Sequence, residues 1–279
     1  MEELELAVGE LTFTARAEGP AHGDVVLLLH GFPETSHEWR GQLPALASAG
    51  YRAVAPDQRG YAEGARPAAV GDYSVVKLAA DTVGFADALG TSQFHLVGHD
   101  WGGAVAWVCA ALYKERVRTL TSVSTPHPAA LGRSIREGEQ REKSAYMSVF
   151  RAAGAEDRFL ARDGDNLRAN FESFGFDSET VEEYVRVLRR PGAMTGALNW
   201  YRANDFATSV DFVLPPITVP TLYVWPDGDE YLGREAAEWT AGYVTGPYRF
   251  EVLDGISHWA PEEAPDALNA LLLEHLAGR

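Results

Sequence analysis

The sequence has almost no cysteine and little positive charge. Its 279 residues include one cysteine, Cys109, so no disulfide can form within the chain and the cysteine content gives no sign of secretion. Lys and Arg number 24 against 40 Asp and Glu, which leaves a formal net charge of −16 at pH 7. Because nucleic acids and anionic membranes reward basic surfaces, this balance disfavours both as partners. It favours a neutral or apolar small molecule as the ligand.

Long hydrophobic runs are also absent. No apolar segment approaches the ~20 residues that a transmembrane helix needs, and the acidic residues 1–5 lack the basic-then-apolar pattern of a signal peptide. We therefore expect a soluble, cytoplasmic protein. Since the sequence contains neither metal-ligand spacing nor a glycine loop that would cradle phosphate, we expect no metal and no cofactor. The hydrophobic content of 46% is ordinary and allows a large core.

Short apolar segments alternate with helical patterns over the first 128 residues. Residues 4–18 alternate polar and apolar side chains, as in an edge hairpin. Continuous apolar runs that suit strands covered on both faces lie at 25–29, 51–55, 94–97 and 117–123. Segments with helical periodicity lie between them, at 39–49 and 74–89. This alternation predicts an α/β fold with a mostly parallel central sheet and helices on both faces.

The composition changes after residue 128. Residues 129–205 contain charged helical segments with interleaved aromatic side chains and no strand of the earlier kind. Strand-like runs resume at 221–225 and 248–253, and an amphipathic helix is expected from 265 to 276. We therefore predict one core domain made of residues 1–128 and 206–279, interrupted by an all-helical insertion at 129–205.

One turn at the end of a predicted strand carries a special spacing. Residues 98–103 read GHDWGG and connect an apolar run to an alanine-rich helical segment. Gly98 and Gly102 flank Asp100 by two positions on each side, as a sharp strand-to-helix turn requires, because a neighbouring Cβ would clash there. Such a turn usually carries a serine, whereas here it carries a carboxylate. We predict that Asp100 is a covalent nucleophile; the alternative is an aspartate that only stabilises the helix N-terminus.

Two further polar residues follow later strands, at the edge where the sites of open parallel sheets gather. Asp229 follows the first strand after the insertion, and His258 follows the last predicted strand. The order nucleophile, acid, histidine along the chain is the order found in enzymes whose nucleophile lies on such a strand-to-helix turn. Hydrolysis needs a base for water and an acid that orients the base, so we assign His258 and Asp229 to these roles. Asp227 and Glu230 are rivals for the acid, and a solvated loop histidine is the alternative for His258.

Backbone amides near Asp100 can supply donors for a developing oxyanion. The N–H of Trp101 lies at the start of the helix, where the local field favours negative charge. The second candidate donor is the N–H of Phe32, in the turn that follows strand 25–29. We expect no catalytic role for His99, because its side chain should point to the side of the strand opposite Asp100.

These motifs together resemble the epoxide hydrolases of the α/β-hydrolase fold. The resemblance rests on the HGFP turn at 30–33, the GHDWGG elbow at 98–103 and the Gly-x-x-His-Trp ending at 255–259, and it covers residues 10–277. It implies an α/β-hydrolase fold in which the helical insertion is a cap over the site.

The resemblance extends into the insertion. Residues 198–202, LNWYR, are similar to the cap motif that carries a ring-opening tyrosine, here Tyr201. Tyr146, within residues 144–150, matches the second cap tyrosine. The alternative for both tyrosines is an aromatic side chain packed in the core.

The implied reaction has two steps. Asp100 attacks an epoxide carbon while Tyr146 and Tyr201 donate to the epoxide oxygen, which leaves a hydroxyalkyl ester on Asp100. Water activated by His258, which Asp229 orients, then hydrolyses the ester with the two backbone amides as oxyanion donors, and a vicinal diol leaves. We expect a small, largely apolar epoxide and water as ligands, neither nucleic acid nor membrane as a partner, and a monomer or homodimer.

Two other functions share parts of this pattern. A haloalkane dehalogenase uses the same Asp-His-Asp chemistry but binds a departing halide, for which Trp101 could be one donor. The second donor is commonly an asparagine where this chain has Phe32, or a tryptophan in the cap, while Tyr146 and Tyr201 suit the protonation of oxygen. A fluoroacetate-type dehalogenase would have arginine in place of Trp101. A non-catalytic binding protein is disfavoured because nucleophile, acid and base are all present.

Overall fold

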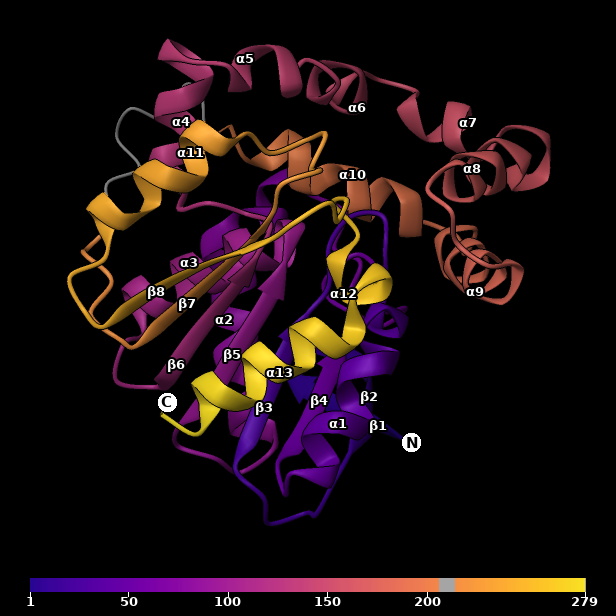
Figure 1. Cartoon of the computed structure of the whole chain (residues 1–279). Helices are drawn as coiled ribbons and strands as arrows, with labels where there is room; N and C mark the ends of the chain where they lie inside the picture. Colours follow the sequence, from indigo (N-terminus) through magenta and orange to yellow (C-terminus); the bar gives the residue numbers. More distant parts are fainter. Residues whose placement is uncertain (206–213, 279) are drawn as a thin grey trace.

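A computed structural model describes residues 1–205 and 214–278, and these residues contain one eight-stranded sheet (Figure 1). Its strand order is β1-β2-β4-β3-β5-β6-β7-β8. The strands are β1 (Glu2–Val8), β2 (Leu11–Glu18), β3 (Val25–Leu29), β4 (Arg52–Pro56), β5 (Phe94–His99), β6 (Val117–Val123), β7 (Thr221–Pro226) and β8 (Tyr248–Leu253). The hairpin β1–β2 lies at one edge of the sheet, where β2 pairs antiparallel with β4. The other strands, β4, β3, β5, β6, β7 and β8, are all parallel to one another. The predicted mostly parallel sheet with an edge hairpin is confirmed.

The core has two layers because strand β3 is buried on both faces. Leu27 and Leu29 pack into one hydrophobic cluster with α2 (Val75–Ala88) and α3 (Asp100–Leu112). Val26 and Leu28 pack into the other, with α1 (Gln42–Ser48) and α13 (Pro265–Leu276). Burial of each such leucine stabilises the fold by roughly 1.5–3 kcal/mol. The helices thus cover both faces of the sheet, as predicted (Figure 1).

Short helical elements complete the core. These are α11 (Arg234–Trp239), α12 (Ala260–Glu263) and the 3₁₀ turns η1 (Ser36–Gly41), η2 (Val70–Tyr73) and η3 (Thr240–Tyr243). The single helix predicted over 39–49 is wrong in its first turn, which is 3₁₀. The hydroxyl of Thr35 caps this turn by accepting the N–H of His37, so the chain begins to coil before the α-helix starts at Gln42.

The insertion is helical, as predicted, and it lies over one end of the sheet (Figure 1). Its helices are α4 (Pro128–Glu137), α5 (Gln140–Lys143), α6 (Met147–Arg151), α7 (Ala155–Phe159), α8 (Ala161–Ser173), α9 (Ser178–Leu188) and α10 (Ala193–Ala203). No strand occurs between residues 128 and 205. The predicted return to the core at residue 206 lies outside the described residues.

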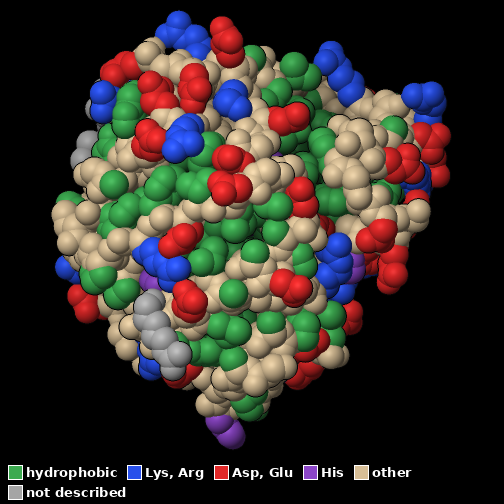
Figure 2. Space-filling model, viewed as in Figure 1, with side chains coloured by type: hydrophobic (Ala, Val, Ile, Leu, Met, Phe, Trp, Pro, Cys, Tyr) green, Lys and Arg blue, Asp and Glu red, His purple; other side chains and the backbone are tan. Residues whose placement is uncertain are grey.

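The surface charge is mixed. Figure 2 shows acidic and basic side chains interspersed over the visible face, on the insertion as well as on the core. In the part of the chain that the structure describes, no helix has both the length and the hydropathy needed to cross a membrane.

Candidate active site

Asp100 lies at a sharp turn between β5 and α3. Its φ of +47° is in the left-handed region, which non-glycine residues seldom adopt. A Cβ on Gly98 would lie 2.2 Å from the carbonyl oxygen of Gly102, and a Cβ on Gly102 would lie 2.0 Å from that of Leu29. Both positions therefore require glycine, and the turn predicted from their spacing is confirmed. The turn places the Asp100 side chain at the carboxyl end of the strand, beneath the insertion.

The carboxylate of Asp100 has two polar neighbours. Its Oδ1 accepts the backbone N–H of Phe32 at 2.8 Å, and its Oδ2 lies 3.6 Å from Nε2 of His258. Burial by itself raises the pKa of Asp100, but contact with His258, the charge of His99 and the Phe32 amide outweigh burial and lower the pKa below its usual value. Asp100 is therefore ionised at neutral pH, as a nucleophile must be. The predicted donor Phe32 contacts it directly.

Trp101 lies in the first turn of α3, next to Asp100. Its indole packs edge-to-face against Tyr201, with the ring centroids 5.0 Å apart. The side chain thus forms part of the contact between core and insertion, while its backbone amide is in the first turn of a helix, where the dipole favours negative charge.

His258 and Asp229 form a buried pair. Nδ1 of His258 contacts Oδ2 of Asp229 at 2.8 Å, although 29 residues separate them. Burial lowers the pKa of His258, but the charge of Asp229 and the contacts with Asp100 and Asp229 raise it to about 9. Asp227 instead accepts the N–H of Gly255 at 2.6 Å, and Glu230 is exposed. Of the three candidate acids, Asp229 is therefore the one whose carboxylate contacts His258.

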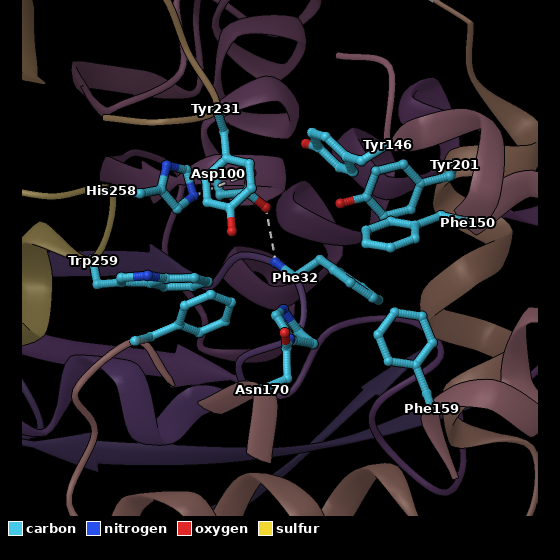
Figure 3. Close-up of a pocket in the computed structure, with 12 residues that line it drawn as sticks. Phe32, Asp100, Tyr146, Phe150, Phe159, Asn170, Tyr201, Tyr231, His258 and Trp259 are labelled. Atoms are coloured by element: carbon cyan, nitrogen blue, oxygen red, sulfur yellow. Dashed lines mark hydrogen bonds and ion pairs between the residues drawn. The ribbon is translucent and has the colours of Figure 1, made fainter. Parts of the chain in front are cut away.

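The two tyrosines predicted in the insertion come together above Asp100. Tyr146 directly precedes α6 and Tyr201 lies on α10, and their ring centroids are 6.4 Å apart. Figure 3 shows both hydroxyls pointing toward Asp100. Burial and the nearby negative charge of Asp100 raise the pKa of each phenol well above 10. Both phenols are therefore neutral hydrogen-bond donors at neutral pH, and both line a cavity.

That cavity has a volume of about 190 Å³ and lies between the sheet and the insertion. Besides Asp100, His258, Tyr146 and Tyr201, its lining is mostly aromatic: Phe32, Pro33, Phe150, Phe159, Asn170, Phe174, Tyr231 and Trp259 (Figure 3). A mostly apolar pocket with a few convergent polar groups suits a small, largely apolar ligand. Tyr231 and Asn170 were not among the residues predicted from the sequence. Only the position of Tyr231, two residues after Asp229, could have suggested it.

A second group of buried ionisable side chains lies behind this site. Nδ1 of His99 is 3.1 Å from carboxylate oxygens of both Glu34 and Glu38, and Nε2 donates to the backbone carbonyl of His258 at 2.9 Å. Burial lowers the pKa of His99, but the two carboxylates raise it well above 6.5. These contacts of His99 were not predicted from the sequence, because a buried ion pair leaves no periodic pattern.

The three groups Glu34, Glu38 and His99 are close enough together to hold a metal ion. A doubly protonated imidazole has no lone pair for a metal, however, and both nitrogens of His99 already face hydrogen-bond acceptors. The contacts fit a buried ion pair that supports the backbone of His258.

Comparison with known proteins shows the family to which the chain belongs. A sequence profile of the alpha/beta hydrolase fold matches residues 24–265. Epoxide hydrolase A of Mycobacterium tuberculosis is 33% identical to this chain over 93% of this chain and 92% of its own length. The chain belongs to the α/β-hydrolase-fold epoxide hydrolase family. The resemblance inferred from the three motifs is thereby confirmed, and the protein is an enzyme of the hydrolase class.

Other members of the family have similar sequences and structures. Epoxide hydrolase 4 of Mus musculus is 36% identical over 94% of this chain and 75% of its own length. The crystal structure of a Bacillus megaterium epoxide hydrolase in complex with an inhibitor aligns with a TM-score of 0.91 at 26% identity, over 98% of this chain and all of that one. Because this alignment covers 98% of the chain, the similarity includes the insertion as well as the sheet.

Proposed function

We propose that this enzyme opens a small, largely apolar epoxide to a vicinal diol through a covalent ester on Asp100. The observation that carries the proposal is that an ionised carboxylate and two neutral phenols, those of Tyr146 and Tyr201, line one aromatic cavity. Ring opening needs a nucleophile at carbon and a proton donor at the departing oxygen. These side chains supply both. We also propose that residues 129–205 form the cap and the rest of the chain the core.

In the first step, Oδ2 of Asp100 attacks an epoxide carbon and the carbon–oxygen bond breaks. One phenol gives its proton to the oxygen while the other donates a hydrogen bond. Oδ1 is held by the amide of Phe32, so it remains as the ester carbonyl oxygen. The Phe32 amide, together with that of Trp101, then stabilises negative charge on this oxygen in the second step.

In the second step, His258 acts as the base for water. Esterification removes the negative charge of Asp100, which is one of the groups that raise the pKa of His258, so the imidazolium releases its proton more readily. That proton replaces the one lost by the phenol. Neutral His258, oriented by Asp229, takes a proton from water as the oxygen attacks the ester carbonyl. The bond between the ester carbonyl carbon and Oδ2 then breaks, and Oδ2 takes the remaining proton of the attacking water and leaves as a hydroxyl of the diol. Ionised Asp100 and protonated His258 are thereby restored.

A haloalkane dehalogenase with the same three residues is the second candidate. Trp101 places an indole beside Asp100, but the second position named for a halide donor is occupied by Phe32. The side chain of Phe32 is a hydrocarbon that packs against Tyr201, with the ring centroids 5.1 Å apart. The tyrosine hydroxyls support an oxygen substrate. We therefore rank epoxide hydrolysis above halide release.

A matched pair of substrates tests this choice. Purified enzyme is incubated with styrene oxide and, separately, with 2-phenylethyl bromide, which has the same carbon skeleton. We expect the phenyl diol to form from the epoxide and no bromide to be released, with the Asp100→Ala variant inactive toward both. Bromide release faster than diol formation would favour the dehalogenase. Absence of diol from this and a short aliphatic epoxide would contradict the proposal.

A further inference from the structure

The loop that carries the candidate acid is held from above by the insertion. We call residues 229–233 the acid loop. Gln140, at the start of α5, is completely buried and contacts this loop twice: its Nε2 donates to the carbonyl of Tyr231 at 2.6 Å, and its Oε1 accepts the N–H of Gly233 at 2.9 Å. Nε2 also donates to the hydroxyl of Ser144 at 2.9 Å. Because a carbonyl only accepts and an N–H only donates, the amide has a single possible orientation.

Lys143, at the other end of α5, adds a charged contact. Its ammonium group donates to the backbone carbonyls of Asp229 at 2.9 Å and Glu230 at 3.2 Å. Hydrogen bonds from a charged donor are stronger than neutral ones. One short helix of the insertion therefore binds four backbone groups of the acid loop, namely the carbonyls of residues 229, 230 and 231 and the N–H of Gly233.

The acid loop in turn orients the candidate acid. The N–H groups of Tyr231 and Leu232 donate to Oδ1 of Asp229 at 2.7 and 2.9 Å. This leaves Oδ2 for the 2.8 Å contact with Nδ1 of His258. Any movement of the loop backbone would therefore rotate the carboxylate and weaken its contact with the imidazole.

The same part of the insertion also holds a candidate proton donor. Tyr146 lies two residues after Ser144, and its ring packs edge-to-face on Tyr231, with centroids 5.4 Å apart. Tyr231 in turn packs against His258 at 5.0 Å. Tyr146 and His258 therefore both pack against Tyr231 of the acid loop, which also contains Asp229.

We propose that Gln140, assisted by Lys143, is a positioning residue that sets the orientation of Asp229 and thereby of His258. The inference rests on the proposed function in that the positioned pair would act in ester hydrolysis. Its immediate consequence, the state of His258, is measurable without any substrate.

A similar amide elsewhere in the protein provides a matched control. Asn204, after α10, is also buried and also joins the insertion to the core: its Oδ1 accepts the N–H of Val75 at 2.8 Å, and its Nδ2 donates to the carbonyls of Tyr73 at 3.0 Å and Trp200 at 2.8 Å. It has the same amide chemistry as Gln140, but the side-chain hydrogen bonds described for it go to residues 73, 75 and 200, outside the acid loop. Loss of either amide should lower the stability of the protein, whereas only loss of the Gln140 amide should change the pKa of His258.

The test is an NMR titration of His258 in the full-length wild-type enzyme and in Gln140→Met and Asn204→Leu variants, with Gln140→Asn as a milder change should the methionine variant fail to fold. The charged groups facing His258 are Asp229, Asp100 and His99, and the first of these belongs to the acid loop. Since Asp229 raises the pKa of His258, loosening it should lower that pKa from about 9 toward 6.5 in the Gln140 variants. Asn204→Leu should leave it unchanged while lowering the melting temperature.

Single-turnover kinetics provide the second readout. Misplacement of a catalytic group by about 1 Å can cost on the order of 10²-fold in rate, so we expect Gln140→Met to slow ester hydrolysis by 10-fold or more and Asn204→Leu by less than 2-fold. An unchanged pKa of His258 in folded Gln140 variants, or an equal change in Asn204→Leu, would overturn the inference. Failure of every epoxide to react would contradict the proposed function, and the titration would still decide the role of Gln140.

Discussion

Nε2 of His258 lies 3.6 Å from Oδ2 of Asp100. This separation is longer than a hydrogen bond, yet it is short enough for the charges to interact. The imidazole faces Oδ2 of Asp100 and not Oδ1, which accepts the Phe32 amide. It therefore lies next to the ester that would form on Oδ2. In the proposed mechanism, His258 therefore stabilises the resting carboxylate and acts as a base only after Asp100 has reacted.

Replacing His258 with glutamine should therefore trap the ester. Glutamine can still donate a hydrogen bond to Asp229, which keeps that buried carboxylate paired, but it cannot accept a proton from water. Mass spectrometry of the intact His258→Gln protein after exposure to an epoxide should show one added substrate mass. Asp100→Asn is the control and should show none. Consumption of epoxide by the glutamine variant with no adduct would refute the assigned roles.

The ionisation of His258 should depend on Asp100. In the resting enzyme His258 is a cation beside two carboxylates, so removing one negative charge destabilises the cation and lowers the pKa. NMR titration should give about 9 for the wild type and a value between 6.5 and 9 for Asp100→Asn, because Asp229 still raises it. In the ester, hydrolysis should accordingly slow as the pH falls through this lower pKa. Equal midpoints in the two proteins would contradict the argument.

The two phenols should matter for ester formation and not for ester hydrolysis. Tyr201→Phe and Tyr146→Phe each keep the ring and remove one donor, and loss of a positioned proton donor costs on the order of 10²-fold in rate. Stopped-flow fluorescence should show slower ester formation in both variants with little change in the second step. Tyr113→Phe, at the end of α3 and outside the cavity, is the control. Normal ester formation in the Tyr146→Phe, Tyr201→Phe double variant would exclude the phenols as proton donors.

The glycines of the elbow should be required for stability as well as for activity. A Cβ on Gly102 would meet the backbone oxygen of Leu29 at 2.0 Å, and relief of such overpacking costs roughly 1–3 kcal/mol. Urea unfolding of Gly102→Ala should show a loss of that size. Gly71→Ala is the matched control, because nothing lies within 4 Å of its added Cβ, and it should change stability by less than about 0.5 kcal/mol. Equal stabilities would mean that the elbow can relax.

The strands and the elbow could be predicted from the sequence because their signals are local. Leu27 lies in a continuous apolar run, and Asp100 lies between glycines at the needed spacing; each pattern has one physical explanation. Asp229 and His258 follow strands that end at the same edge of the sheet, so topology alone brings them near Asp100. Tyr146 and Tyr201 came from a family resemblance, since nothing local marks a tyrosine as facing a cavity.

Contacts between distant segments could not be predicted in this way. Gln140 lies 93 residues from Gly233, and its role depends on how α5 packs on the acid loop. Glu34 and His99 are 65 residues apart, and a buried pair of this kind has no periodic pattern. Asn170 lines the cavity only because α8 is folded against it. Such side chains become visible when the packing of helices is known.

The central claim, that water attacks an ester on Asp100 and not the epoxide, is tested most directly by a single turnover in H₂¹⁸O with enzyme in excess over styrene oxide. If the ester forms, the first diol takes its new oxygen from Asp100, so the diol should carry no label and the peptide that contains Asp100 should gain ¹⁸O. Label in the first diol together with an unlabelled Asp100 would show direct attack by water and contradict the account.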